Sequence, residues 1–158
     1  MHCHTIARLI VTLVLFLSLA MMAAAGPYDG YLKASDIEKT AGLKGVKSIE
    51  RNPSIGAGGD LNFATADGKL IVMVQVVSKS QYAGYKQYFF KSDIKGVGEQ
   101  AMEGTTIPGM PPNLVAFTKG VECVALTAFG DQASDGKKNM LTIDQMKALA
   151  KTIASRMK

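Results

Sequence analysis

The sequence predicts an α+β fold, in which helices pack on a mainly antiparallel sheet built from two hairpins. Three helical segments alternate with two pairs of apolar, strand-like segments along the chain. In the first pair, residues 60–77, two strand-like runs flank Asp67-Gly68, a strong hairpin-turn signal because glycine accepts a positive φ. In the second pair, residues 114–117 and 121–129 flank Lys119-Gly120. Helices separated by antiparallel hairpins are typical of one sheet with helices packed on it.

The second arm of the first hairpin is apolar on both faces. Alternation along this arm places Leu70, Val72, Val74 and Val76 on one face and Ile71, Met73 and Val77 on the other. A strand that is apolar on both faces needs cover on both faces. We therefore expect residues 70–77 to lie inside the sheet rather than at its edge.

Residues 1–25 have the pattern of a signal peptide. Arg8 precedes an apolar run at residues 9–20, and three alanines at residues 23–25 fit a small-residue cleavage site. A retained membrane anchor is the alternative, but the apolar run is short for a span of about 20 residues. Neither a lipid-anchor cysteine after residue 25 nor a twin-arginine pair is present. We expect a secreted protein, periplasmic or extracellular, with no stable membrane anchor after cleavage.

The remaining residues, 26–158, are expected to form a single α+β domain. They number 133, contain no histidine and only one cysteine, and carry 17 basic and 13 acidic residues, a formal charge of +4. Without histidine, neither a Ser-His-Asp nor a Cys-His catalytic arrangement can form. Zinc sites of the usual His or multi-Cys kind and His-ligated haem are excluded as well. We therefore expect no cofactor.

The first elements after residue 25 are predicted from local signals. Ser35 and Glu38 have the spacing of a capping box, and Gly42 suits the end of the short helix that they open. Residues 46–50 are a possible first strand. The glycine-rich segment 54–60 resembles a phosphate loop only superficially, because it leads into a strand and not into a helix N-terminus. We expect it to be a flexible or bulged entry into the first hairpin.

A central helix is expected from Ser78 or Ser80 to about Phe90. Tyr82, Tyr85 and Phe89 stand at helical spacing and predict a face packed on the sheet. Lys86 falls within the same aromatic arc, one turn after Tyr82. Its stem could lie along the tyrosine ring, or its ammonium could bind an anionic ligand beside the rings. The candidate ligand-binding residues are accordingly Tyr82, Tyr85 and Lys86.

The second half of the chain holds a proline-containing loop, the second hairpin and a closing helix. A further strand is possible near residues 99–106, and residues 104–113 form either a plain connector or a binding loop. The acidic residues between 130 and 140 do not have the spacing of a calcium loop. Thr142 and Gln145 then form a capping box before an amphipathic helix.

Cys123 lies in the second hairpin with apolar neighbours on both sides. A lone cysteine in such a strand is usually a buried small hydrophobe. The alternative is an exposed edge strand, on which the thiol could form a disulfide with a second chain. We expect a buried thiol and a monomer.

Three features of the C-terminal 60 residues resemble those of a known group of domains. These are Gly96-x-Gly98-Glu99-x-Ala101, the apolar hairpin turning at Lys119-Gly120, and the closing Thr142-x-x-Gln145 helix with Leu149-Ala150. The pattern is similar to small secreted or envelope domains of unknown function with a Mog1/PsbP-like or sensor-type α+β fold. The resemblance implies a binding or sensing module and supplies no catalytic residues.

Two classes of function remain open from the sequence. The first is a non-enzymatic binding or interaction module whose partner is a protein or small-molecule ligand in the envelope. The second is a hydrolase-type enzyme that uses paired carboxylates, for which the available side chains are Asp60, Asp67, Glu99, Glu103 and Glu122. Carboxylate pairs have to be judged by their distance in space. No run of basic residues marks a nucleic-acid footprint, so nucleic acid is not an expected partner.

Overall fold

The computed structural model describes residues 26–130 and 138–158, so the predicted signal peptide lies outside the described residues. The helices are α2 (Ala34–Ala41), the short 3-10 helix η1 (Pro53–Ile55), α3 (Lys79–Phe89) and α4 (Ile143–Arg156). The strands are β1 (Lys47–Ile49), β2 (Leu61–Ala64), β3 (Leu70–Val77), β4 (Phe90–Asp93), β5 (Gln100–Gly104), β6 (Leu114–Lys119) and β7 (Glu122–Ala128). The expected α+β class is confirmed.

The seven strands form one antiparallel sheet in the order β1-β2-β3-β7-β6-β5-β4. Both predicted hairpins are present, as β2–β3 and β6–β7, and Gly68 turns the first with φ 87°. β3 lies between β2 and β7, with Val74 opposite Leu126, as its two apolar faces predict. The pairing of β3 with β7 joins the two hairpins into a single sheet.

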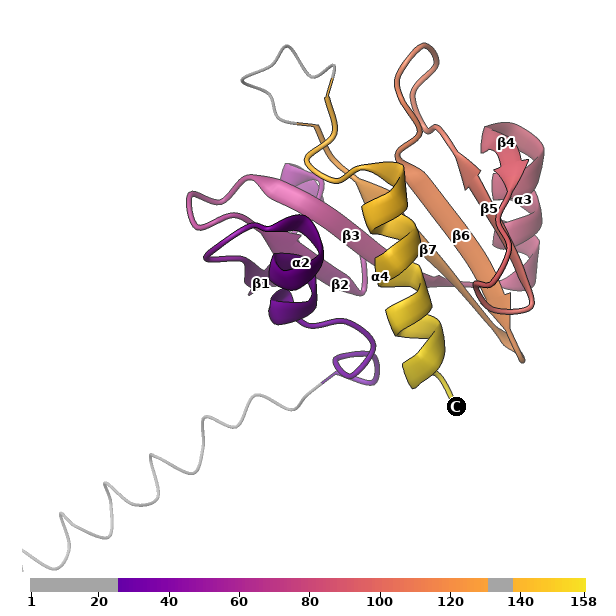
Figure 1. The fold of residues 1–158 in the computed structure, drawn as a ribbon, viewed down its shortest axis with the longest axis horizontal. Helices are drawn as coiled ribbons and strands as arrows, with labels where there is room; N and C mark the ends of the chain where they lie inside the picture. The colour runs from indigo at the N-terminus through magenta and orange to yellow at the C-terminus, as the bar shows by residue number, and fades with distance from the viewer. Residues whose placement is uncertain (1–25, 131–137) are drawn as a thin grey trace, which may run out of the picture.

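Helices cover both faces of this sheet. Figure 1 shows α2 and α4 on the near face, α2 in front of β1–β3 and α4 in front of β6 and β7, and α3 beyond the strands β4–β6. The larger core lies under α2 and α4 and contains Phe63, Phe117 and Leu126. The smaller core lies under α3 and contains Tyr82, Met102 and Cys123. The two faces of the sheet therefore bury unequal amounts of apolar surface.

Helix α3 ends at Phe89, as predicted, but residues 90–93, for which the sequence predicts no strand, form β4. Phe90 is extended (φ −60°, ψ 134°), and the carbonyl of Phe89 accepts a hydrogen bond from Thr105 N at 3.2 Å. This close approach depends on Gly104, because a Cβ there would stand 2.0 Å from the Phe89 oxygen. The strand results from pairing with β5, which a helical pattern alone does not reveal.

The cap of α2 differs from the prediction by two residues. The helix begins at Ala34, before Ser35, and Asp36 rather than Glu38 supports the start by accepting a hydrogen bond from Lys33 N at 2.8 Å. Glu38 instead accepts from Val46 N at 3.1 Å, which ties the helix to the chain before β1. The C-terminal prediction is confirmed, since Gly42 has φ 69° and donates to Glu38 O.

The glycine-rich segment is a close-packed entry into β2, and its amides bind within the chain. A Cβ at Gly59 would lie 2.3 Å from Met73 Cγ and 2.6 Å from Val74 O, so only glycine fits. The buried Asn62 side chain accepts from Gly59 N and donates to Gly59 O, both at 3.0 Å. These hydrogen bonds satisfy a polar group that burial would otherwise destabilise.

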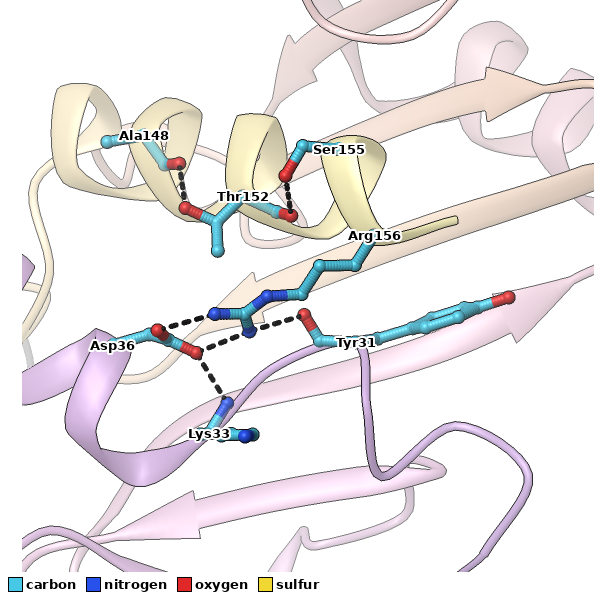
Figure 2. Close-up of polar contacts among 7 residues, drawn as sticks. All are labelled: Tyr31, Lys33, Asp36, Ala148, Thr152, Ser155 and Arg156. Atoms are coloured by element: carbon cyan, nitrogen blue, oxygen red, sulfur yellow. Dashed lines mark hydrogen bonds and ion pairs between the residues drawn. The ribbon is translucent and has the colours of Figure 1, made fainter. Parts of the chain in front are cut away.

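Helix α4 is tied to the rest of the chain at both ends. Thr142 caps its start, as predicted, by accepting from Gln145 N. At its end, Lys119 Nζ donates to the carbonyls of Ala154 (2.6 Å) and Met157 (2.7 Å), a favourable position for a cation because these carbonyls carry the negative end of the helix dipole. Figure 2 shows Arg156 joining the same turn to Asp36 of α2 and to the carbonyl of Tyr31.

Among residues 26–130 and 138–158, no helix combines the length and apolar character needed to cross a membrane.

Candidate functional site

Helix α3 is positioned by its own capping box and by its aromatic face. Ser78 Oγ accepts from Gln81 N, and Gln81 Oε1 accepts from Ser78 N at 2.8 Å. Tyr82 is only 6% exposed, and Tyr85 and Phe89 pack partly buried beside it with ring centroids 5.9 Å apart. This face packs on the sheet as its helical spacing predicts.

The three predicted ligand residues differ in how far their side chains are buried. Tyr82 is part of the smaller core, and its pKa is raised by burial and by the negative charge of Asp93. Tyr85 is half-buried with its hydroxyl donating to Gln75 Oε1 at 3.3 Å, and burial raises its pKa as well. Lys86 is exposed. Only Lys86 therefore has a side chain largely open to a large partner.

Lys86 contacts β4 rather than the Tyr82 ring. Its Nζ lies 5.7 Å from the centroid of the Phe90 ring and 3.4 Å from Asp93 Oδ1. The stacking over Phe90 is a cation–π contact, which at an exposed position contributes about 0.5–1 kcal/mol. Phe90 is the residue that follows α3 and stands four positions after Lys86, the spacing at which side chains meet along a helix.

Two exposed aromatic side chains were not singled out from the sequence. Tyr88 is 72% exposed and Phe90 is 44% exposed. We call the exposed basic and aromatic side chains of this region the α3–β4 edge; they are Lys86, Tyr88, Phe90, Lys91 and Lys95, and the exposed Gln87 and Asp93 lie among them. The sequence contains one indication that Tyr88 is exposed. Tyr88 falls outside the helical stripe formed by Tyr82, Tyr85 and Phe89.

Most of the net charge of the chain after residue 25 lies in the segment from the start of α3 to Lys95. Residues 79–95 contain four lysines and one aspartate, a formal charge of +3. The rest of residues 26–158 contains 13 basic and 12 acidic residues, which leaves +1. Lys86, Lys91 and Lys95, with the exposed Asp93 among them, give the α3–β4 edge itself a formal charge of +2 beside two exposed aromatic rings.

A polar hollow is also present at the first turn of α3, at the other end of the helix from Phe90. Its volume is 210 Å³, and its lining is Lys79, Tyr82, Glu99, Gln100, Thr118 and Gly120. Lys79 stands seven residues before Lys86, so the two ammonium groups lie along the same flank of the helix.

The five candidate carboxylates are held by five different sets of neighbours. Their partners are Val76 N for Asp60, Thr65 and Lys69 for Asp67, Gly120 N for Glu99, Ser92 and Lys147 for Glu103, and Tyr31 for Glu122. None of the five shares a hydrogen-bond or ion-pair partner with another within the described parts of the chain. The arrangement gives no carboxylate pair of the kind that glycoside hydrolysis or a shared proton requires.

Glu103 is the most enclosed of these carboxylates. Its Oε2 lies 2.6 Å from Lys147 Nζ of α4, and its Oε1 accepts from Ser92 Oγ at 2.8 Å. Burial acts to raise the pKa of Glu103, but the hydrogen bonds from Lys147 and Ser92 and the lysine charge outweigh burial and lower it. Glu103 is therefore an ionised side chain that joins the sheet to α4.

Glu122 has a different effect on its partner. Its carboxylate accepts a hydrogen bond from the Tyr31 hydroxyl, and this bond, together with burial and the negative charge of Glu122, raises the pKa of Tyr31 to about 12. The tyrosine stays protonated at any physiological pH and works as a donor. This contact ties the segment before α2 to the start of β7.

The proline-containing loop is anchored by a buried asparagine. Asn113, 6% exposed, accepts from Thr106 N at 2.8 Å and donates to Ala128 O at 3.3 Å. Ile107 at the tip is 55% exposed. The loop thus has a fixed base and one apolar side chain in solvent, which agrees with a connector and leaves the binding-loop alternative open.

The prediction that Cys123 is buried is confirmed. It is fully buried in the smaller core, beside Val77 and Ala125, and burial raises the pKa of its thiol despite the opposing charge of Lys79. A thiol in this state is a poor nucleophile, since the thiolate is the reactive form.

Within the described residues, no group of three or more His, Cys, Asp or Glu side chains is arranged to hold a metal ion. Comparisons with protein-family models, with curated proteins and with solved structures give no match. The resemblance to Mog1/PsbP-like or sensor-type domains stays a prediction from the sequence.

Proposed function

We propose that residues 26–158 are an exported, non-enzymatic binding module that contacts an acidic protein of the envelope or the extracellular space through the α3–β4 edge. The export step rests on the signal-peptide pattern of residues 1–25. The binding role rests on the side chains of α3 and β4.

The observation that carries the proposal is the coincidence of charge and exposed aromatic surface. Residues 79–95 hold +3 of the +4 formal charge, and Tyr88 and Phe90 are 72% and 44% exposed in the same segment. Aromatic side chains are enriched at the centres of protein interfaces, where they supply large contact areas. Clustered charge of one sign steers a partner of the opposite sign and fixes its orientation. Together these features suit an acidic surface that also offers apolar contacts.

The edges of the sheet favour a side-chain surface over strand addition as the mode of contact. β1 and β4 have three and four residues, and exposed Lys47 and Lys91 lie on them. Short edge strands that carry lysine discourage pairing with another strand. The same property is consistent with the expectation that the protein is a monomer.

A capture experiment with a charge-matched control tests the proposal. Tagged protein is expressed with its signal peptide, and the envelope fraction is passed over the wild type, over Lys86→Ala/Lys91→Ala and over Lys44→Ala/Lys151→Ala. Both variants lose two exposed lysines, but Lys44 and Lys151 lie outside the α3–β4 edge. We expect a partner with an acidic contact region that the first variant loses and the second retains, with binding that weakens as salt is raised.

Equal loss of the partner by the two variants would show that only total charge matters, and full retention by both would show that neither pair of lysines contributes. A basic partner, or capture that does not depend on salt, would remove the electrostatic argument altogether. In either case the α3–β4 edge would not be the contact surface.

A further inference from the structure

The proline-containing loop, residues 105–113 between β5 and β6, presents an apolar and uncharged tip to solvent. Residues 104–118 contain no charged side chain. Ile107 is 55% exposed, Pro108 beside it is exposed as well, and Met110 is half-buried. Figure 1 shows the loop projecting beyond the ends of β5 and β6. The apolar side chains therefore stand at the end of a projection, where a broad, flat surface can reach them.

Almost every backbone N–H group that the loop has is already bonded within the protein. Three of its nine residues are prolines, which have no N–H, and five of the remaining six N–H groups donate to acceptors in the described chain. The five donors belong to Thr105, Thr106, Ile107, Met110 and Asn113. An N–H group that loses water without gaining another acceptor raises the free energy of transfer to apolar surroundings. The loop therefore loses few hydrogen bonds when it leaves water.

The polar side chains of the loop are bonded inside the protein as well, and these contacts fix its shape. Thr105 Oγ1 donates to Ile107 O at 2.9 Å. Asn113 Nδ2 donates to Thr106 Oγ1 at 2.8 Å. A turn at the tip is closed by Met110 N, which donates to Ile107 O at 3.1 Å. A loop that is ordered in this way before binding loses little conformational entropy when it binds.

Two exposed lysines lie near the base of the loop. Lys138 lines the same hollow as the two adjacent prolines of the loop. Lys91 follows Phe90, which pairs with Gly104 at the end of β5. An apolar tip with cations set back from it matches the layers of an anionic membrane surface, where phosphates lie outside the acyl chains. A pocket on another protein would fit the apolar tip alone, so the placement of the cations favours lipid.

We propose that this loop attaches the protein reversibly to an anionic phospholipid surface. Ile107 and Met110 enter the boundary between headgroups and acyl chains, and Lys91 and Lys138 lie at the phosphates. A segment of this kind lies in the membrane interface and does not span the membrane. The inference goes beyond the acidic protein partner, because Ile107 and Met110 lie outside the α3–β4 edge and the two surfaces share only Lys91.

A single tryptophan reports insertion directly, because the natural chain contains none. Residues 26–158 are used, since the apolar residues 9–20 would themselves bind lipid. Ile107→Trp is compared with Val121→Trp, because Val121 is 87% exposed and lies in the β6–β7 turn, at the opposite end of β6 from the loop. With vesicles of phosphatidylglycerol and phosphatidylcholine, the emission of Ile107→Trp should shift to shorter wavelength and be quenched by lipids brominated in their acyl chains. The emission of Val121→Trp should not change.

Vesicle flotation of tryptophan-free variants measures the size of the effect. Ile107→Ser should weaken binding about tenfold, since burial of a large aliphatic side chain contributes at least that factor, and Val121→Ser should bind like the wild type. Lys138→Ala should weaken binding to the anionic vesicles about fivefold and leave binding to pure phosphatidylcholine unchanged. Ile107→Ser should keep the melting temperature of the wild type and should still capture the acidic protein partner, so the two proposals fail independently.

No wavelength shift for Ile107→Trp with anionic vesicles would overturn the inference, as would an equal shift for Val121→Trp or full vesicle binding by Ile107→Ser. A shift with native membranes that is absent with protein-free vesicles of their extracted lipids would assign the loop to a protein pocket instead. Unchanged affinity of Lys138→Ala for anionic vesicles would overturn the choice of an anionic surface.

Discussion

The pair formed by Asp36 and Arg156 should contribute measurably to stability, although it lies near the surface. Arg156 Nη1 lies 2.6 Å from Asp36 Oδ2, and Nη2 lies 2.9 Å from Oδ1, so the contact is bidentate (Figure 2). The side chains are only 33% and 19% exposed, for Arg156 and Asp36 respectively. The perturbation is the double-mutant cycle of Asp36→Ala, Arg156→Ala and both together.

The expected coupling free energy is about 1–2 kcal/mol. Exposed ion pairs contribute roughly 0–1 kcal/mol, whereas hydrogen bonds to charged groups contribute about 1.5–3 kcal/mol. The partial burial and bidentate geometry place this pair between the two ranges. Arg156 Nη1 also donates to Tyr31 O at 3.2 Å, and Asp36 also accepts from Lys33 N. The cycle cancels these additional contacts to a first approximation.

The pair should also give a defined pH dependence. Hydrogen bonding from Arg156 leads the effects that lower the pKa of Asp36 below its usual value. A carboxyl whose folded pKa is depressed stabilises the fold above its unfolded pKa of about 3.9, and that stability is lost as the pH falls through the folded pKa. The coupling should therefore be full at pH 7 and decline below about pH 4.

Urea unfolding of residues 26–158, followed by circular dichroism at pH 7 and pH 3, measures both effects. The matched control is the pair Lys86–Asp93, which is monodentate at 3.4 Å with side chains 47% and 68% exposed. Its coupling should stay under about 0.5 kcal/mol. Equal coupling in the two pairs, or an Asp36–Arg156 coupling that does not change with pH, would refute the reasoning from burial and geometry.

Four further outcomes are expected. Gly84→Ala should raise the free energy of unfolding by about 0.5–1 kcal/mol in urea, because Gly84 is interior to α3 and a Cβ there meets no atom within 4 Å; destabilisation would mean that the helix is strained. Cys123→Ser should lower it by roughly 1–3 kcal/mol, and a thiol reagent should label Cys123 slowly in the native protein and rapidly after unfolding, whereas rapid native labelling would disprove burial. Glu103→Ala should lower it by about 1–3 kcal/mol, since Lys147 loses a 2.6 Å partner, and the wild type should lose this contribution as the pH falls through the depressed pKa of Glu103; a variant as stable as wild type at pH 7 would contradict the role given to that pair. Intact-mass measurement of the native protein should place its N-terminus at or near Gly26, and a retained Met1 would argue against export.

The elements predicted best from the sequence are those with local causes. The Asp67-Gly68 turn, the Thr142 cap and the two-faced apolar pattern of residues 70–77 each depend on a few neighbouring residues, and each is present as expected. Strand β4 was not predicted because it forms by pairing with β5, a segment further along the chain. The helix ends near Phe90 as the sequence predicts, but the pairing of residues 90–93 with β5 also needs Gly104 of that strand, whose missing Cβ permits the close approach to Phe89 O.

The candidate site was predicted only in part for the same reason. Helical spacing identified Tyr82 and Tyr85 as the packed face of α3, but the contact of Lys86 with Phe90, four residues further on, was not predicted. The pairing of Glu99 with the Gly120 turn joins residues 21 positions apart, so the polar hollow could not be seen from spacing. Charge was the exception: the excess of lysine in residues 79–95 is visible in the sequence itself.

Site-specific photo-crosslinking tests the central claim, binding through the α3–β4 edge, most directly. A photoreactive amino acid is placed at Tyr88, which is 72% exposed, and in a control chain at Lys151 on the exposed side of α4. Both chains are exported and irradiated in the native envelope, and the crosslinked products are identified by mass spectrometry. The account predicts a crosslink from position 88 to an acidic protein segment, absent from position 151 and lost when Lys86→Ala/Lys91→Ala is added. No product at position 88, or the same product from both positions, would contradict it.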